Sequence, residues 1–456
     1  MKSEGTVSPA QQLATTFSGR VIEPADAAYD SVRRVHNGLI DKRPALIAEC
    51  RGVADVVDAV RFARDQTLEI AVRGGGHNVG GRATVDAGVM IDLSQMRGVH
   101  VDPATRTAQA EGGTLWKIFN RETQVHGLAT TGGVVGTTGI GGLTLGGGLG
   151  WLLPKHGMAL DNLKSVDLVL ADGKVARASA LENQDLFWAV RGGGGNFGIA
   201  TSFEFALHPI GPMVMGGLAA WPVAMAKDVL RLFRDLCAKA TDDLMLVGAL
   251  LTAPDGETKV VAIGAGHFGS KADGEKALAP IKAFGQPIMD VLGPLPYVAI
   301  NGLLDGAFPT GARNYWKSHF LNELSDDAIA AAIDVAAACP SPMGQIVFEH
   351  FHGAATRVPV SETAYALRSS GFNTVVISEW LDPAHDEACI AWGKKGYASL
   401  KPFGGAQRYV NYLTNDESID EALVAVYGPN LAKLRQIKKK HDPDNVFHLN
   451  VNIKPA

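Results

Sequence analysis

One histidine of this sequence sits in a run of glycines, where it could act as a nucleophile. Residues 73–81 read Arg-Gly-Gly-Gly-His-Asn-Val-Gly-Gly, with His77 in the middle. Consecutive glycines expose backbone N–H groups that can bind an anion, and they let a planar ring or a pyrophosphate approach the chain closely. A lone loop histidine is more often only hydrogen-bonded in place, so His77 has a structural and a chemical interpretation.

Two further histidines alternate along a predicted strand. Residues 347–352 read Val-Phe-Glu-His-Phe-His, and alternate residues of a strand share one face. His350 and His352 therefore point the same way, and a neutral imidazole near pH 7 is a suitable general base. The pair could instead ligate a metal in a hydrolase, although no third ligand follows at a spacing typical of metal sites. It could also lie solvated on the surface. We expect no metal.

Glycine is concentrated in three stretches of the first 200 residues, 74–81, 132–150 and 192–198. It accounts for 53 of the 456 residues, about 12% against a usual ~7%. Clustered glycine inside structured sequence indicates backbone packed against a group that leaves no room for side chains.

The last of these stretches contains a G-x-G-x-x-G match at 193–198. A dinucleotide-binding loop needs a strand before this motif and a helix after it, so that the helix N-terminus meets the pyrophosphate. Here a helical pattern precedes the motif and an alternating, strand-like pattern follows it. The sequence therefore argues against a Rossmann-type site.

The elements that must position these residues follow an α+β pattern, not the regular alternation of a doubly wound sheet. Apolar spacing predicts helices at 52–66, 115–126, 182–191 and 430–440. Alternation and turn dipeptides predict strands or hairpins at 68–72, 89–93, 100–111, 165–177, 199–207, 245–251, 259–263, 345–352 and 374–380. Glycine thins after about residue 209, which places a second domain at 209–412.

Composition excludes several classes of protein. Apolar residues make up 46% and charged residues 20%, with a net charge of −5 and no basic block, so a nucleic-acid partner is not expected. No stretch approaches the roughly 18 apolar residues of a membrane span, and residues 1–5 begin no apolar signal core. The cysteines show no CxxC or metal spacing, which indicates reduced thiols in a cytoplasmic protein. They are Cys50, Cys237, Cys339 and Cys389.

The second glycine stretch, taken with residues 73–81 and the tail, resembles a known family. Residues 132–150 are followed by Pro-Lys-His-Gly at 154–157, and the tail contains Tyr-Val-Asn-Tyr at 409–412 and Asp-Pro-Asp-Asn-Val-Phe at 442–447. Together these segments resemble the berberine bridge enzyme-like branch of the vanillyl-alcohol-oxidase flavoproteins. The resemblance spans about 35–210 and 405–455, and the middle of the chain matches more loosely.

The resemblance implies a two-part FAD-binding domain of the PCMH type, formed by 1–208 and 413–456. An α+β substrate domain on an antiparallel sheet, residues 209–412, is inserted between the two parts. It also implies that His77 is bonded to the flavin 8α-methyl group. Many members add a cysteine bond to the flavin, but Val135 stands at that position, so a single 8α-N-histidyl link is expected. The other residues expected at the cofactor are Arg73, Gly74, Gly75, Gly76, Asn78, Val79, Gly80, Gly133, Thr138, Gly139, Gly142, Gly146, Gly147, Gly198, Ile199, Asn450 and Asn452.

Catalytic candidates also follow from the resemblance. Comparison with relatives aligns His350 and His352 with ionisable residues near the flavin. Glu379, before a tryptophan, matches a catalytic glutamate of the family, and Tyr409 and Tyr412 match tyrosines at the active site of plant members. Which of these is the base stays open.

The expected function is an FAD-linked oxidase. It would pass hydride from a C–H next to oxygen or nitrogen of a small organic substrate to the flavin, and oxygen would become hydrogen peroxide. Thr138 departs from the small apolar residue expected where the family controls oxygen access, so a dehydrogenase with another acceptor is the alternative. A further alternative is a flavin-binding protein without catalytic activity. The sequence names neither the substrate nor the oligomeric state.

Overall fold

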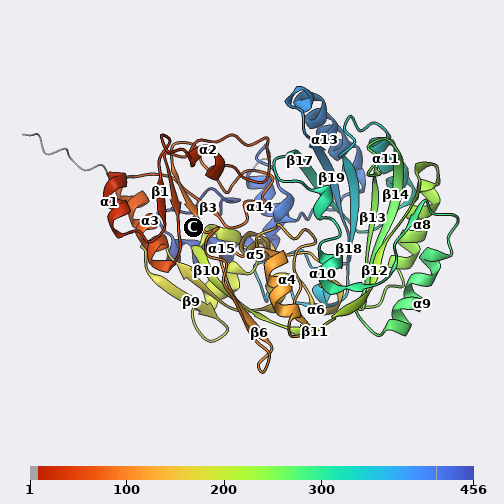
Figure 1. The fold of residues 1–456 in the computed structure, drawn as a ribbon, viewed down its shortest axis with the longest axis horizontal. Coiled ribbons are helices and arrows are strands. Elements are labelled where there is room, and N and C mark those ends of the chain that lie inside the picture. The colour runs from red at the N-terminus through yellow and green to blue at the C-terminus, as the bar shows by residue number, and fades with distance from the viewer. Residues whose placement is uncertain (1–8, 417–418) are drawn as a thin grey trace, which may run out of the picture.

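Two β-sheet regions meet along a seam in the computed structural model, which describes residues 9–416 and 419–456 (Figure 1). The first region, at the left of the view, combines the N-terminal half of the chain with its C-terminal tail. The second, at the right, contains the middle of the chain. Residues 1–5, where no signal core is expected, lie outside the described residues.

A small sheet of the first region contains parallel strands. Its order is β1-β2-β4-β3, and both β2 and β3 pair in parallel with β4. Helix α3 (Val53–Asp65) connects β2 to β3 and buries Val56, Ala59 and Val60 in the core beside them. The strands are β1 (Arg20–Ile22), β2 (Leu46–Glu49), β3 (Ile70–Arg73) and β4 (Val89–Asp92). The α+β prediction is confirmed overall, and this parallel unit is a local exception to it.

A five-stranded antiparallel sheet carries most of the core of the first region. Its order is β5-β6-β10-β8-β9. Trp116 of α4 (Trp116–Gln124), Phe205 of β10 and Leu434 of α15 (Leu431–His441) share one apolar core, so the tail returns to the first region. The remaining elements are β5 (Val99–Asp102), β6 (Thr107–Glu111), β8 (Leu163–Val169), β9 (Val175–Ser179), α7 (Gln184–Val190) and β10 (Ile199–Ala206). A helix before 193–198 and a strand after it confirm that this motif lacks the Rossmann context.

The second region is built on a larger antiparallel sheet of order β15-β12-β14-β13-β18-β19-β17, with β16 also paired to β12. Helices cover one face of this sheet, and the other face is turned toward the first region (Figure 1). The helices are α8 (Ala226–Cys237), α9 (Lys271–Lys282), α11 (Asp326–Ala337) and α13 (Asp386–Leu400). The strands are β12 (Met213–Pro222), β13 (Leu244–Thr252), β14 (Lys259–His267), β15 (Met289–Asp290), β16 (Gly293–Pro296), β17 (Arg313–Leu321), β18 (Gln345–Phe351) and β19 (Gly371–Trp380).

A segment between β18 and β19, residues 359–368, packs into the first region. The backbone N–H of Ala364 donates to the carbonyl of Trp188 at 3.2 Å. Arg368 donates two hydrogen bonds of 2.8 Å to the carboxylate of Asp161. The limits 1–208, 209–412 and 413–456 therefore stay a prediction, because the large sheet lies within 213–380 while this segment contacts the other region.

Candidate active site

Two glycine loops form the walls of one long cavity. Gly75, after β3, lies on one wall, and Gly139 and Gly142, at helix α5 (Ile140–Gly146), lie on the other. A Cβ on Gly75 would stand 2.3 Å from the nitrogen of Gly139, so the loops touch backbone to backbone. No atom lies within 4 Å of the place where a Cβ of Gly142 would be. That wall is therefore bare backbone, as close approach of a flat ring requires.

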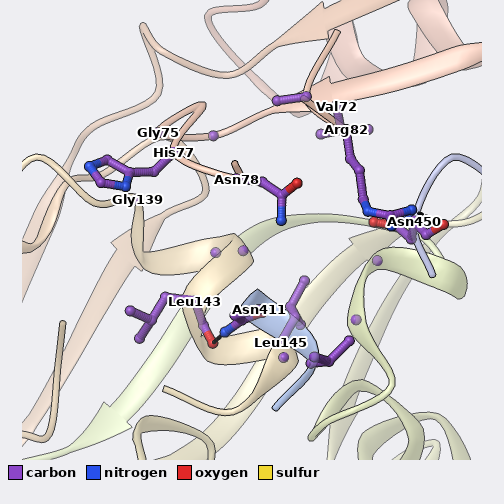
Figure 2. Close-up of a pocket in the computed structure, with 18 of the residues that line it drawn as sticks. Val72, Gly75, His77, Asn78, Arg82, Gly139, Leu143, Leu145, Asn411 and Asn450 are labelled. Carbon is purple, nitrogen blue, oxygen red and sulfur yellow. Dashed lines mark hydrogen bonds between the residues drawn. The ribbon is translucent and has the colours of Figure 1, made fainter. Parts of the chain in front are cut away.

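The cavity runs from His77 at one end to Arg82 and Asn450 at the other (Figure 2). Arg82 Nη1 donates to the Asn450 carbonyl at 2.8 Å, which ties the tail to the loop after β3. Asn411 Nδ2 donates to the carbonyl of Leu143 at 3.1 Å and places the segment around 411 against α5. Loop, helix and tail together give a long, glycine-walled site that suits an extended molecule with a planar end.

The environment of His77 keeps its imidazole neutral. The ring stacks on His36 with 3.7 Å between centroids and an interplanar angle of 17°. Its Nε2 lies 3.2 Å from Thr137 Oγ1. Burial, with a smaller contribution from His36, lowers the pKa of His77 to about 3. A neutral imidazole retains the lone pair that a nucleophile needs.

Most of the residues expected at the cofactor line this cavity. They are Gly74, Gly75, Gly76, His77, Asn78, Val79, Gly133, Thr138, Gly139, Gly142, Gly146, Gly198, Ile199 and Asn450. Gly80, Gly147 and Asn452 do not line it, and neither does Arg73. Arg73 pairs with the buried carboxylate of Asp92 and donates to the carbonyls of Val32 and Arg34. This corrects the expectation that Arg73 faces the cofactor, because its guanidinium is bound to Asp92 and to two backbone carbonyls.

A glutamate that the sequence analysis did not single out lies in the cavity. Glu349 Oε1 accepts a hydrogen bond from the Tyr412 hydroxyl at 3.1 Å, and Oε2 accepts one from Asn373 Nδ2 at 2.5 Å. Burial raises the pKa of Glu349 to about 7, and the two donors offset this in part. A carboxyl group that titrates near neutral pH can act as a general base there.

Both candidate tyrosines also line the cavity. Tyr409 Oη accepts hydrogen bonds from the backbone N–H of Gly148 at 3.0 Å and from Asn411 Nδ2 at 2.8 Å. Burial raises the pKa of Tyr409 to about 12 and also raises that of Tyr412. Both phenols therefore stay protonated near neutral pH, and Tyr412 is the one that donates to the carboxylate.

Comparison with known proteins identifies the family. Residues 44–179 match the FAD binding domain family, and residues 408–454 match the family described as berberine and berberine like. The chain is 31% identical to (R)-6-hydroxynicotine oxidase of Paenarthrobacter nicotinovorans, over 97% of this chain and 99% of that protein. The chain belongs to the berberine bridge enzyme-like FAD-linked oxidoreductases.

Solved structures of this family agree in fold. The crystal structure of 6-hydroxy-D-nicotine oxidase from Arthrobacter nicotinovorans superposes with a TM-score of 0.86 at 28% identity, covering 96% of this chain and 98% of that one. Glucooligosaccharide oxidase from Acremonium strictum gives a TM-score of 0.87 at 26% identity, covering 98% and 100%. The family resemblance, the PCMH-type fold and the assignment as an FAD-linked enzyme are thereby confirmed.

Two catalytic candidates of the sequence lie on the wrong face of the large sheet. Glu349 points into the cavity, so its neighbour His350 points to the helix-covered side. There His350 stacks on His352 with 3.9 Å between centroids and on Phe372 at 5.4 Å, and Phe372 packs against Phe233 of α8. The two histidines do share a face, as expected. That face is turned away from the cavity, which corrects their proposed role as the base.

Glu379 lies on the cavity side of the sheet but far along it. Glu349 pairs with Asn373 across β18 and β19, and Glu379 is six residues further on, about 20 Å away at strand spacing. Its side chain is fully buried and neither carboxylate oxygen completes a hydrogen bond within the described residues. Burial raises the pKa of Glu379 to about 8, offset only in part by the Asn314 amide on β17. The expectation that it serves as the base is corrected by this distance.

We expect Glu379→Gln to stabilise the protein at alkaline pH. The carboxyl pKa rises from 4.5 to about 8 on folding. The contribution of protonated Glu379 to the free energy of unfolding is therefore complete below pH 4.5 and is lost as the pH rises through about 8. Glutamine cannot ionise, so the melting temperature of the variant should exceed that of the wild type by a few degrees at about pH 8.5 and equal it at about pH 4. Thermal unfolding checks this, with the exposed Glu257→Gln as control. Equal melting curves at the alkaline pH would contradict it.

The described residues hold no group of three or more histidine, cysteine, aspartate or glutamate side chains that could bind a metal ion. No helix in the same part of the chain is both long enough and apolar enough to cross a membrane.

Proposed function

We propose that this enzyme is an oxidase that takes hydride from a C–H bond next to oxygen or nitrogen of a small organic substrate. One observation carries the proposal: the hydrogen-bonded pair Glu349 and Tyr412 lies in the same glycine-walled cavity that ends at His77. The site thus combines a neutral nucleophile for holding a cofactor with a base that titrates near neutral pH. Relatives named as oxidases support the proposal.

The cavity residues fit FAD. The open space at Gly142 leaves room for a planar ring against bare backbone, and the backbone contact between Gly75 and Gly139 leaves no room for side chains where the two loops touch. When bound, FAD supplies the hydride acceptor. His77 would hold it covalently, while Arg82 and Asn450 close the far end of the cavity.

The chain's own residues would handle the proton. The carboxylate of Glu349 accepts the hydroxyl proton of Tyr412, and Tyr412 in turn accepts the O–H or N–H proton of the substrate. Asn373 holds the second oxygen of Glu349, so the carboxylate keeps the orientation that this transfer needs.

A single covalent link is part of the proposal. Glucooligosaccharide oxidase from Acremonium strictum carries a 6-S-cysteinyl, 8α-N1-histidyl FAD. In this chain Val135 lines the cavity, and none of Cys50, Cys237, Cys339 and Cys389 does. His77 is then the attachment residue, with no thiol placed to form a second bond.

His77→Ala tests the attachment. We expect yellow colour and flavin fluorescence to stay with the acid-denatured wild-type chain on a gel and to be absent from the variant, because no other nucleophile replaces the imidazole. His208→Ala is a matched control, since His208 also stacks on a histidine, at 3.7 Å from His156, but does not line the cavity. Flavin that washes away from the wild type as well would rule out a covalent role for His77.

Oxygen is the proposed electron acceptor, and hydrogen peroxide the product. Thr138 lines the cavity at the position where the family resemblance places control of oxygen access, which makes a dehydrogenase with another acceptor the second candidate. Oxygen uptake with equimolar peroxide would support the oxidase. Turnover with a dye acceptor and none with oxygen would identify the dehydrogenase.

A further inference from the structure

The substrate end of the cavity contains three aromatic rings set edge to face. Trp316 and Tyr412 have ring centroids 5.7 Å apart at 67°, and Tyr412 and Tyr409 have centroids 5.0 Å apart at 89°. All three side chains line the cavity, but Tyr409 is only 2% exposed, so Trp316 and Tyr412 are the rings that a ligand can contact. The indole N–H of Trp316 donates to Asn314 Oδ1 at 2.9 Å, so it is not free to bind a ligand. Trp316 can therefore contact a ligand only through the surface of its ring.

One carboxylate stands beside these rings. Glu349 is the only acidic side chain among the described residues that line the cavity, and its basic lining residues are His77 and Arg82. Arg82 lies at the other end with Asn450 (Figure 2), and His77 is neutral because its pKa is lowered by burial. Each Glu349 oxygen accepts one hydrogen bond, whereas an ionised carboxylate has about four acceptor positions. The carboxylate therefore has capacity for a further donor.

Most of the other side chains at this end are apolar, apart from Asn411, whose amide is hydrogen-bonded to Tyr409 and to the Leu143 carbonyl. Val79, Val134, Val135 and Leu149 line the cavity near the rings and the carboxylate. Val79 and Val135 share an apolar cluster with Trp316. A carbohydrate, with a hydroxyl on nearly every carbon, would leave many hydroxyls without partners against such walls, at a cost for each one. Rings around one carboxylate instead match an ammonium group, which is attracted to aromatic faces and to negative charge.

We propose that the substrate is an apolar amine, bound as its ammonium ion against Trp316 and Tyr412 with Glu349 as its counter-ion. This inference rests on the proposed function and specifies the substrate class of the same site. Glu349 then also takes a proton from the bound ammonium, directly or through Tyr412. The N–H bond breaks, the proton moves to a carboxylate oxygen, and the electron pair stays on nitrogen. The free amine that results is the form from which a neighbouring C–H can be lost as hydride.

Three benzyl compounds test the charge requirement on the purified holoenzyme. N-methylbenzylamine carries a charge and can be deprotonated, benzyltrimethylammonium carries a fixed charge, and benzyl methyl ether is uncharged and of similar shape. Dissociation constants come from changes in tryptophan fluorescence and in the flavin absorption spectrum. We expect both cations to bind at least 10-fold more tightly than the ether, and only the amine to bleach the flavin. Ether binding as tight as that of the cations would overturn the proposal.

Substitutions distinguish an effect of the Glu349 charge on binding from a general effect on the fold. Glu349→Gln keeps the shape and removes the charge, so it should weaken binding of benzyltrimethylammonium at least 10-fold and leave the ether unchanged. Glu379→Gln, on the same sheet face but outside the cavity, should bind all three ligands as the wild type does. Trp316→Leu should weaken binding of the cations more than binding of the ether. If this variant does not fold, the Glu349→Gln result decides.

Cellobiose distinguishes failure of this inference from failure of the proposed function. Covalently held flavin that is bleached by cellobiose, but not by the amine, would overturn the proposal of an amine substrate and leave the proposed oxidase function standing. A wild-type protein without flavin would instead overturn the proposed function.

Discussion

Replacing Glu349 with glutamine should lower kcat/KM by roughly 10²- to 10⁴-fold, the usual contribution of a general base. The amide cannot accept the Tyr412 proton, although it fills the same space and can still bind Asn373. The pKa of Glu349 is raised to about 7, and the carboxylate is the active form. Wild-type kcat/KM should therefore rise with pH through about 7, and the variant should lose this ascending limb. Steady-state kinetics from pH 5 to 9 measure both effects.

Tyr412→Phe provides the partner measurement. Because Tyr412 and Glu349 would act in one transfer, the double variant should be little worse than either single variant. Glu379→Gln is the matched control, since that carboxyl also titrates above its usual range but lies outside the cavity, and it should keep the wild-type limb. An ascending limb that persists in Glu349→Gln would assign the base to another group.

Asp161→Ala should destabilise the protein by about 3–5 kcal/mol, the usual effect of removing one partner from a buried ion pair. Arg368 and Asp161 are only 3% and 9% exposed, so the substitution leaves a buried guanidinium without its counter-charge. Asp161 Oδ2 also accepts the backbone N–H of Met158 at 2.9 Å. The loss should appear as a lower midpoint in urea unfolding with an unchanged slope.

An exposed ion pair shows whether burial is the cause. Arg357 and Asp242 are 60% and 46% exposed, and Asp242→Ala should cost less than about 1 kcal/mol. Replacing both buried partners, as in Asp161→Leu with Arg368→Met, should cost less than Asp161→Ala, since no unpaired charge remains. Equal losses in Asp161→Ala and Asp242→Ala would show that burial of the ion pair does not cause the larger loss of stability.

The large-sheet strand 345–351 marks the limit of what the sequence predicts at this site. Alternation predicts the strand and predicts that His350 and His352 share a face, and both hold in the structure. It does not say which face meets the cavity. That choice depends on α8 and α11 covering one side, and it places Glu349, next to His350 in the sequence, at the site. Apolar neighbours give no signal, because Val347 and Phe351 share the face of Glu349 while Ile346 and Phe348 share the face of His350.

Local sequence by itself determined the glycine loops, the place of His77 within one of them, most of the helices and strands, and through them the family. These features depend on residues close together in the chain, such as the glycines of 73–81 and the Gly127 that follows α4 with φ of +64°. Helix α5 is an exception, because its glycine-rich sequence has weak helical propensity and packing holds it in place.

Tertiary structure alone decided which ionisable groups meet. Glu349 and Tyr412 are 63 positions apart and hydrogen-bonded, whereas Glu379 shares their sheet face yet lies about 20 Å along its strand. Arg73 pairs with Asp92 and does not face the cavity. Burial depth, the choice of strand face and the partner across the seam set these outcomes, and each arises from contacts between segments far apart in the sequence.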